Sequence, residues 1–151
     1  MSVSVKNTID QKANLIYKIV KFIDWPNESS INAFNVQVIG SYEAFESIQQ
    51  NLQGKNIQGK PFAVSFAKSV TEATSGNVLI VDEGETLSSA IAQDIAKRPI
   101  LTISLAPNLS FPSIVTFNET NVQFEVNLHH AQKAGVTVNF QLLQVANRVI
   151  K

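Results

Sequence analysis

VQFEVNLHHAQKAGVTVNFQLLQVANRVI, residues 122–150, changes the period of its apolar residues partway along, and that change predicts the local fold. Val122, Phe124 and Val126 alternate with polar residues, which is typical of a strand with one apolar face. Because alternate side chains of a strand lie on opposite faces, we expect these three residues to be buried together.

Two helices are expected after this strand. Asn127 has a side chain suited to cap the first of them, over residues 128–134, and Gly135 is suited to the left-handed conformation that ends a helix. After the extended residues 136–138, a second helical run is expected to reach the end of the chain. The residues that it is expected to direct toward the core are Phe140, Leu143, Val145 or Ala146, and Val149.

The rest of the chain alternates between helical and strand patterns. A first helix is expected to start at Thr8, which can form a capping box with Gln11, and to end before Pro26. Further strands are expected over residues 34–40, 61–67, 78–81, 100–105 and 114–117, and further helices over residues 43–52 and 86–97.

The order of these elements predicts a single α/β domain. Strands that alternate with helices in the first part of the chain favour parallel pairing. The segment 118–121 suits a hairpin turn, so residues 114–117 and 122–126 are expected to pair in the antiparallel direction. The sequence therefore predicts a mixed, mostly parallel sheet of about six strands, with a late antiparallel hairpin and helices on both faces.

The charges of the chain are balanced and scattered. Its 151 residues include 12 basic residues, 12 acidic residues and no cysteine. Clustered Lys and Arg are needed to neutralise phosphates, so this distribution argues against nucleic-acid binding. A net charge near zero gives little repulsion between copies, which favours a homodimer or a bound partner. The lack of cysteine excludes disulfides and thiolate chemistry.

No motif in the sequence indicates catalysis, a cofactor or a metal site. The 6 glycines form no phosphate-binding loop, and no serine stands in a G-x-S-x-G elbow. His129 and His130 are adjacent, so on a helix their side chains point about 100° apart and cannot chelate one ion as an i, i+4 pair would. We therefore expect both histidines to be solvated surface residues and the protein not to be an enzyme.

Residues 12–26, KANLIYKIVKFIDWP, form the first half of a two-part pattern, and the F-E-V-N…A..AG…LL..A..V run of residues 124–149 forms the second. In this order the two parts resemble the YfiR-like family of small periplasmic proteins of Gram-negative bacteria. The best-known member of that family represses a membrane-bound diguanylate cyclase. The resemblance covers most of the chain and implies the same mixed α/β fold.

The chain departs from the family pattern in two places. Family members often have a cysteine that opens the strand found here at residues 76–81, and a glycine pair before the penultimate strand, where this chain has residues 110–113. Redox regulation and a role for that loop are therefore not carried over from the family.

The resemblance implies a periplasmic, non-enzymatic signalling protein. It would bind the periplasmic domain of a membrane-bound diguanylate cyclase, or of another membrane sensor, hold the cyclase inactive and lower cyclic di-GMP. The alternative is a small-molecule binding or transport-accessory module that uses the crevice at the carboxyl ends of the parallel strands.

The first residues carry no signal peptide, and no stretch approaches the ~18 apolar residues of a membrane span. For a periplasmic protein, we therefore expect the export signal to have been removed. Residues 1–7 are expected to be disordered or added, and residues 8–151 to form the YfiR-like domain.

Apolar residues around Trp25 and in the loop of residues 106–113 are the expected partner contacts. Trp is enriched at the energetic centres of interfaces. Core packing of the corner between helix and loop is the other interpretation of Trp25 and Pro26. The full set of expected contacts is Tyr17, Phe22, Trp25, Pro26, Phe111 and Pro112.

Glu125 lies between the apolar residues of the strand at 122–126 and points away from their face. If a helix covers that face, the carboxylate needs a charged or hydrogen-bonding partner. Lys12 and Lys21 stand where the family pattern has lysine, and either can supply it. We expect a buried ion pair that specifies the fold, with a ligand contact as the alternative. Asn127 is the other polar residue with an expected structural role.

Overall fold

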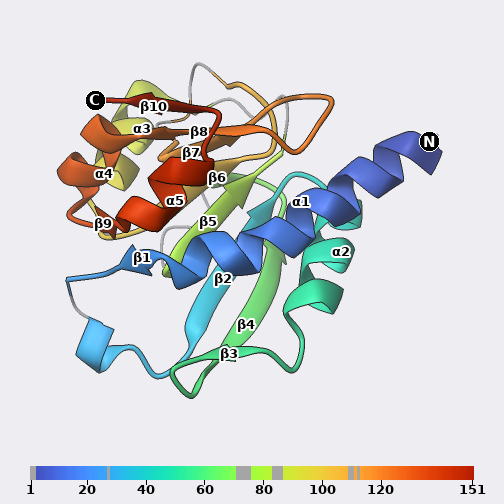
Figure 1. The fold of residues 1–151 in the computed structure, drawn as a ribbon, viewed down its shortest axis with the longest axis horizontal. Helices are drawn as coiled ribbons and strands as arrows, with labels where there is room; N and C mark the ends of the chain where they lie inside the picture. The colour runs from blue at the N-terminus through green and yellow to red at the C-terminus, as the bar shows by residue number, and fades with distance from the viewer. Residues whose placement is uncertain (1–2, 27, 71–75, 83–86, 109–110, 112) are drawn as a thin grey trace.

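Strands from most of the chain meet in one large mixed sheet (Figure 1). The computed structural model describes residues 3–26, 28–70, 76–82, 87–108, 111 and 113–151, with the backbone alone for residues 3–7. In these residues the sheet has eight strands, in the order β10-β8-β7-β6-β5-β2-β4-β3. Their bounds are β2 (Phe34–Ile39), β3 (Asn56–Ile57), β4 (Lys60–Ala67), β5 (Val78–Val81), β6 (Leu101–Ser104), β7 (Val115–Phe117), β8 (Phe124–Asn127) and β10 (Arg148–Ile150).

Most neighbouring strands of the sheet are parallel. β2 pairs in parallel with β4 and β5, β5 with β6, β6 with β7 and β10 with β8, whereas β7–β8 and β3–β4 are antiparallel. The late hairpin is confirmed, with Val115 opposite Val126 and Phe117 opposite Phe124. The mixed, mostly parallel α/β sheet is also confirmed, and its described part has eight strands rather than the expected six or so.

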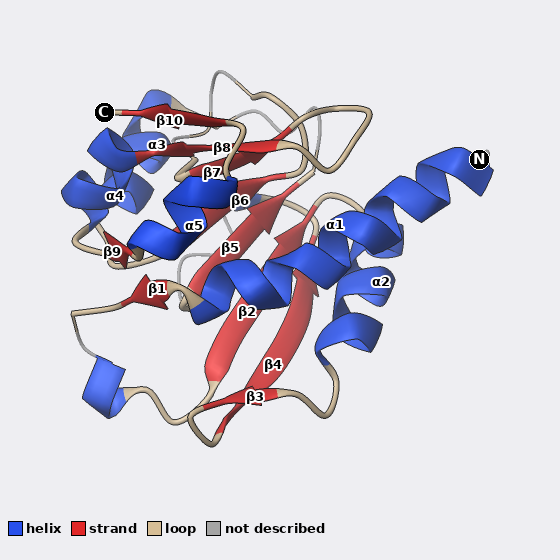
Figure 2. Cartoon of the chain, viewed as in Figure 1, coloured by secondary structure: helices blue, strands red, loops and turns tan. Residues whose placement is uncertain are grey.

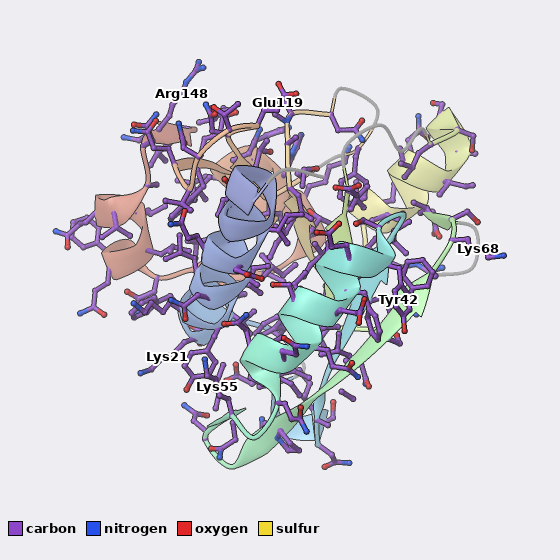
Figure 3. The ribbon with its side chains drawn as sticks, turned by 90° about the vertical axis from the view of Figure 1, so that its right-hand side faces the viewer. Lys21, Tyr42, Lys55, Lys68, Glu119 and Arg148 are labelled. Carbon is purple, nitrogen blue, oxygen red and sulfur yellow. The ribbon has the colours of Figure 1, made fainter. Side chains whose placement is uncertain are left out.

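Helices cover both faces of this sheet (Figure 2). α1 and α2 cross one face side by side (Figure 3), and α3 lies on the other. A separate antiparallel ladder joins β1 (Ile23–Asp24) to β9 (Thr137–Val138). None of the described helices combines the length and the hydropathy that crossing a bilayer requires. The helices are α1 (Val3–Lys21), α2 (Tyr42–Leu52), α3 (Ser89–Ala96), α4 (Leu128–Ala134) and α5 (Phe140–Val145).

Alternate residues of the central strands enter two separate apolar layers. In β5, Val78 and Ile80 belong to the layer beneath α1 and α2, whereas Leu79 and Val81 belong to the layer beneath α3. All four residues are buried. This is the arrangement expected of a continuous apolar strand that helices cover on both faces.

The strand expected at residues 122–126 begins at Phe124. Phe124 and Val126 are buried in the layer beneath α1, as expected, but Val122 precedes the strand and is half-buried. The delay follows from the hairpin turn, because the side chain of Asn121 accepts the backbone N–H of Gln123 at 2.9 Å. This local bond extends the turn up to the start of β8.

α1 starts at Val3, so the start expected at Thr8 is wrong, and the helix runs through the boundary expected between residues 7 and 8. Residues 3–7 contain neither Pro nor Gly, so nothing in them stops a helix that packing has already stabilised. The buried side of α1 includes Ala13, Ile16 and Val20, each at most 1% exposed.

α3 is shorter than the helix expected over residues 86–97. It begins at Ser89, after the N-cap Ser88, and residue 86 lies outside the described part of the chain. Ile95 is buried beneath it, whereas Ala90 is exposed. Ala90 lies in the first turn of the helix, and Ile91 and Ala92 after it pack against the apolar layer.

Of the two helices expected in the C-terminal segment, one is confirmed and the bounds of the other are wrong. α4 forms as expected, with the side chain of Asn127 accepting the backbone N–H of His130 at 2.9 Å and Gly135 ending the helix at φ 82°. α5 is short, however, and residues 148–150 form β10 beside β8. Without β10, the backbone groups on this side of β8 would be unpaired, so the final residues are more stable as a strand.

α5 also exposes side chains that the helical period predicts to be buried. Phe140 and Val145 are each 68% exposed, and Val149 belongs to β10. Leu142 is the buried residue of α5, and Leu143 and Ala146 are half-buried. The apolar residues of this helix are spread around its circumference, since successive residues are about 100° apart, so they cannot all face the sheet.

Candidate functional site

A groove of about 760 Å³ lies between α1 and α5, with the start of β8 at its floor. Small-molecule sites commonly have volumes of ~300–1,000 Å³, so the space is large enough for a ligand or for side chains of a partner. We call it the α1–α5 groove. It is lined by Leu15, Lys18, Ile19, Phe22, Val122, Gln123, Phe124, Gln141, Leu142, Val145, Ala146 and Asn147.

The α1 wall is a second apolar stripe of that helix. Leu15, Ile19 and Phe22 follow one another at spacings of four and three residues, which places them on one helix face. Leu15 and Phe22 are half-buried, whereas Ala13 and Ile16 are covered completely by the sheet. Ile19 is only 1% exposed, so α1 packs one stripe on the core and presents Leu15 and Phe22 of the adjacent stripe to the groove.

The α5 wall is held in place by backbone hydrogen bonds at both of its ends. Before the helix, Asn139 donates its N–H to the carbonyl oxygen of Phe22 at 2.9 Å, next to the β1–β9 ladder. After the helix, Asn147 donates its N–H to the carbonyl oxygen of Phe124 at 2.8 Å. These bonds connect α5 to the end of α1 and to β8, so the walls are positioned by the fold itself.

The floor of the groove and part of its rim are apolar. Phe124 is 7% exposed, and its ring meets that of Phe117 edge to face at a centroid distance of 5.8 Å. Val145, on the rim, is 68% exposed. Covering an exposed aliphatic side chain next to an apolar floor is favourable, because it removes apolar surface from water.

The charge of the groove is positive on the α1 side. Lys18 is the only charged residue of the described lining, and the exposed Lys21 follows it by one turn at the end of α1 (Figure 3). Both lysines lie in the last turn of α1, where a positive charge also complements the helix dipole. Gln141 and Asn147 leave the α5 side neutral.

The residues expected to contact a partner are not brought together. Phe22 lies in the groove. Tyr17 lies on another side of α1, where its hydroxyl donates to the carbonyl oxygen of Asn56 at 3.1 Å. Pro26 is exposed, and Pro112 lies outside the described residues.

Trp25 and Phe111 are core residues, so the prediction that they are exposed contacts is wrong. Trp25 is 4% exposed, its ring packs on Phe34 at a centroid distance of 5.2 Å, and its Nε1 donates to the carbonyl oxygen of Asn77 at 3.2 Å. Phe111 is 4% exposed in the layer beneath α3. For Trp25, the interpretation as core packing is therefore the correct one.

Lys12 has a structural role, but with different partners from those expected. Its Nζ donates to the carbonyl oxygen of Leu105 at 2.6 Å and to that of Glu119 at 3.4 Å, and it lies 5.7 Å from the ring centre of Phe117. The ammonium group thus joins α1 to the end of β6 and to the β7–β8 turn. Backbone carbonyls and an aromatic face stabilise this buried charge.

Glu125 lies on the face of β8 that points away from α1. It is half-buried and stands opposite Thr116 of β7 and Arg148 of β10. Lys12 and Lys21 both belong to α1, which packs on the other face, so the expected ion pair with either lysine is wrong. The alternation of side chains along β8 already indicated this result, because it places Glu125 and the buried Phe124 on different faces of the strand.

The two histidines differ in their surroundings. His129 is exposed as expected, whereas His130 is half-buried and its Nδ1 lies 2.8 Å from the carbonyl oxygen of Ser113. The ring of His130 thus connects α4 to the segment before β7, so the prediction of a solvated side chain is wrong for it. The described residues contain no group of three or more His, Cys, Asp or Glu side chains that could hold a metal ion.

Most of the groove was not predicted from the sequence. The stripe of Leu15, Ile19 and Phe22 was detectable, since its spacing is that of a helix face adjacent to the buried one. The α5 wall was not, because its helical period predicts that either Val145 or Ala146 points toward the core and does not decide between them. In the structure Ala146 is half-buried and Val145 is exposed, and α5 ends before the strand β10.

The chain matches a known protein family. A family model described as YfiR/HmsC-like matches residues 10–147, a range that includes both walls of the groove. No curated protein matches the chain significantly. The matched family is regulatory and non-catalytic, and it supports a periplasmic regulatory role in diguanylate cyclase signalling.

Proposed function

The chain belongs to the YfiR/HmsC-like family, and we propose that it binds the periplasmic domain of a membrane-bound diguanylate cyclase and represses the enzyme, which lowers cyclic di-GMP. In this proposal the protein is a regulator and not an enzyme. The observation that carries the proposal is the α1–α5 groove, which has fixed walls, an apolar floor and the exposed Val145 on its rim.

Repression requires that the protein binds the inactive cyclase better than the active one. A regulator with equal affinity for both states shifts no equilibrium, however tightly it binds. To move an equal mixture to 99% inactive enzyme, the affinities must differ by about 100-fold, or about 2.7 kcal/mol. A groove with fixed walls suits this role, because a rigid surface accepts one arrangement of its partner and rejects others.

Binding and enzyme activity test this proposal together. If a membrane-bound diguanylate cyclase is encoded next to this chain, its periplasmic domain is immobilised, and its affinity for the purified chain is measured by biolayer interferometry. Cyclic di-GMP production by the full-length cyclase in nanodiscs is then compared with and without the chain. We expect binding at micromolar concentration or below and reduced production. Absence of binding, or binding that leaves production unchanged, would contradict the proposal.

The second candidate function is a small-molecule binding or transport-accessory module. The volume of the α1–α5 groove, about 760 Å³, favours it because ligand sites have this size. The second candidate was expected to use a crevice at the carboxyl ends of the parallel strands, and the chain that follows β5 and β6 includes residues 83–86, 109, 110 and 112, which lie outside the described part. A neighbouring gene for a membrane-bound GGDEF protein would favour repression, and one for an outer-membrane receptor would favour the module.

We also propose a homodimer, which the net charge of zero favours. Light scattering during gel filtration measures the mass in solution directly. If the measured mass is that of one chain at every concentration, up to 100-fold above those of the binding assay, the protein is not a homodimer under the conditions in which it binds.

A further inference from the structure

We propose, on the basis of the function proposed above, that the α1–α5 groove receives an amphipathic helix of the cyclase's periplasmic domain. The apolar side chains of that helix would lie on Phe124 and Val145, and its carboxylates would lie beside Lys18 and Lys21. The hydrogen bonding, the length and the charge of the groove each support this occupant.

The backbone groups around the groove favour a helix over an extended segment. The walls are helices, whose peptide groups are bonded internally. At the floor, the carbonyl oxygens of Gln123 and Phe124 already accept the N–H groups of Asn118 and Asn147, at 2.8 Å each. A strand buried here would leave its own N–H and C=O groups unpaired. A helix satisfies its own backbone and presents only side chains.

The length of the groove suits a short helix. Leu15 and Phe22, at the two ends of the α1 wall, are seven residues apart, which corresponds to about 10.5 Å along a helix. A partner helix of about two to three turns covers this distance and can place side chains at i, i+4 and i+7 along it. α1 and α5 would then pack against it by ridges and grooves, as helices do in globular proteins.

Charge complementarity indicates which polar side chains the partner helix carries. Lys18 and Lys21 have no ion pair within the described part of the chain, where the one salt bridge joins Arg98 to Asp94 of α3. A carboxylate placed beside these lysines would increase the association rate and select the orientation of the helix. The neutral amides of the α5 wall add no charge preference, so the carboxylates are expected on the α1 side only.

A second copy of this chain is a poorer occupant. In a two-fold interface built on this groove, the lysines of both copies would enter one shared interface, where their like charges repel. A small apolar ligand would not use the two lysines at all. The charged rim therefore distinguishes an acidic amphipathic helix from both of these occupants.

The test compares the affinity of the cyclase's periplasmic domain for the wild-type chain and for four variants, at low and at high salt. Val145→Asp places a charge on the rim, and Lys18→Glu reverses the charge of the α1 wall. Ala90→Asp on α3 and Lys133→Glu in the last turn of α4 introduce the same side chains at exposed positions away from the groove. Thermal melts check that all four variants are folded.

We expect Val145→Asp to weaken binding by about 30-fold, because charge in an apolar contact must be desolvated. Lys18→Glu should weaken binding by about tenfold at low salt and by less at high salt, since salt screens exposed charges. The two control variants should stay within about twofold of wild type. All four variants should melt close to wild type, as the substituted residues are exposed.

Synthetic peptides that span each helix of the periplasmic domain test the shape of the occupant. One peptide should compete with the whole domain and gain helical circular dichroism on binding. A proline in its centre should abolish competition, because proline breaks a helix. Replacement of its carboxylates by lysine should weaken binding to wild type and restore binding to Lys18→Glu.

The outcomes separate this inference from the proposed function. If the domain does not bind the wild-type chain, the proposed function is wrong. If it binds wild type, Val145→Asp and Lys18→Glu equally, the function stands and the groove is not the docking site. Competition that survives the central proline would indicate an extended occupant and overturn the helix. A dimer that only Val145→Asp dissolves would assign the groove to a second copy and overturn the proposal.

Discussion

α4 and α5 are two short helices of the same C-terminal stretch, and they use their apolar residues in opposite ways. α4 has 7 residues and α5 has 6, and an asparagine caps the start of each. α4 buries Ala131 and Ala134 and ends at a glycine. α5 ends without a glycine, at an extended Ala146, and leaves two large apolar side chains in solvent.

This difference indicates that α5, rather than α4, offers apolar side chains to a partner. α4 begins and ends at signals in its own sequence, and its small buried residues serve packing alone. α5 is positioned by hydrogen bonds to Phe22 and Phe124, and its exposed residues contribute nothing to the core. Of the two exposed apolar side chains, Val145 lines the α1–α5 groove and is the one that we place in the proposed binding surface.

The largest expected effect concerns the floor on which α5 rests. Phe124→Ala should lower the free energy of unfolding by about 3–5 kcal/mol, because it leaves a cavity next to Phe117 in the core. The matched control is Phe140→Ala on α5, where the same truncation at an exposed position should change stability by less than about 0.5 kcal/mol. Urea unfolding measures both, and equal losses would contradict the assigned burial.

The next effect concerns the glycine that ends α4. Gly135 has φ 82°, a conformation that costs a residue with a Cβ about 1–2 kcal/mol. Gly135→Ala should therefore destabilise the protein by that amount, measured by thermal unfolding. Gly135→Asn should lose less, since asparagine tolerates this conformation. An alanine variant as stable as wild type would mean that the helix ends in another way.

The two N-caps should have similar effects on stability and different effects on binding. Asn127→Ala and Asn139→Ala each remove the acceptor of a helix-starting N–H, which costs about 1 kcal/mol. Asn139→Ala loosens α5, so it should also weaken partner binding several-fold, whereas Asn127→Ala should not. Urea unfolding and partner affinity are measured on both variants. Equal affinities of the two variants for the partner would show that α5 is not part of the binding surface.

The smallest effect is expected at Glu125. A buried ion pair would make Glu125→Ala cost about 3–5 kcal/mol, because the partner's charge would be stranded. Glu125 is half-buried and away from both lysines, so we expect a loss below about 1 kcal/mol. Glu125→Gln serves as the isosteric comparison. A loss of several kcal/mol for the alanine variant would show that the carboxylate has a strong partner after all.

Local signals account for the parts of the fold that the sequence predicts well. β5 and α4 have the expected bounds, and Asn127 and Gly135 have the expected roles. Each of these features depends on residues within one or two turns of the chain, such as a cap, a stop or a continuous apolar run. The β7–β8 hairpin is equally local, since only the short segment 118–123 separates its strands.

The candidate site was predicted only in part, for a physical reason. Phe22 and its stripe on α1 follow from helical spacing, but the α5 wall depends on residues 148–150 joining the sheet. The partners of Lys12 are likewise carbonyl oxygens more than 90 residues away. No local pattern encodes which distant backbone groups are still unpaired when the chain folds.

The sequence alone therefore determined the class of the fold, the sheet hairpin and the caps of α4, because propensity, capping and periodicity act between near neighbours. The tertiary structure decided that the chain ends in a strand, that α5 is short and that Val145 is exposed beside α1. These features arise because an open edge of β8 has to pair its backbone groups, and the final residues are the segment close enough to do so.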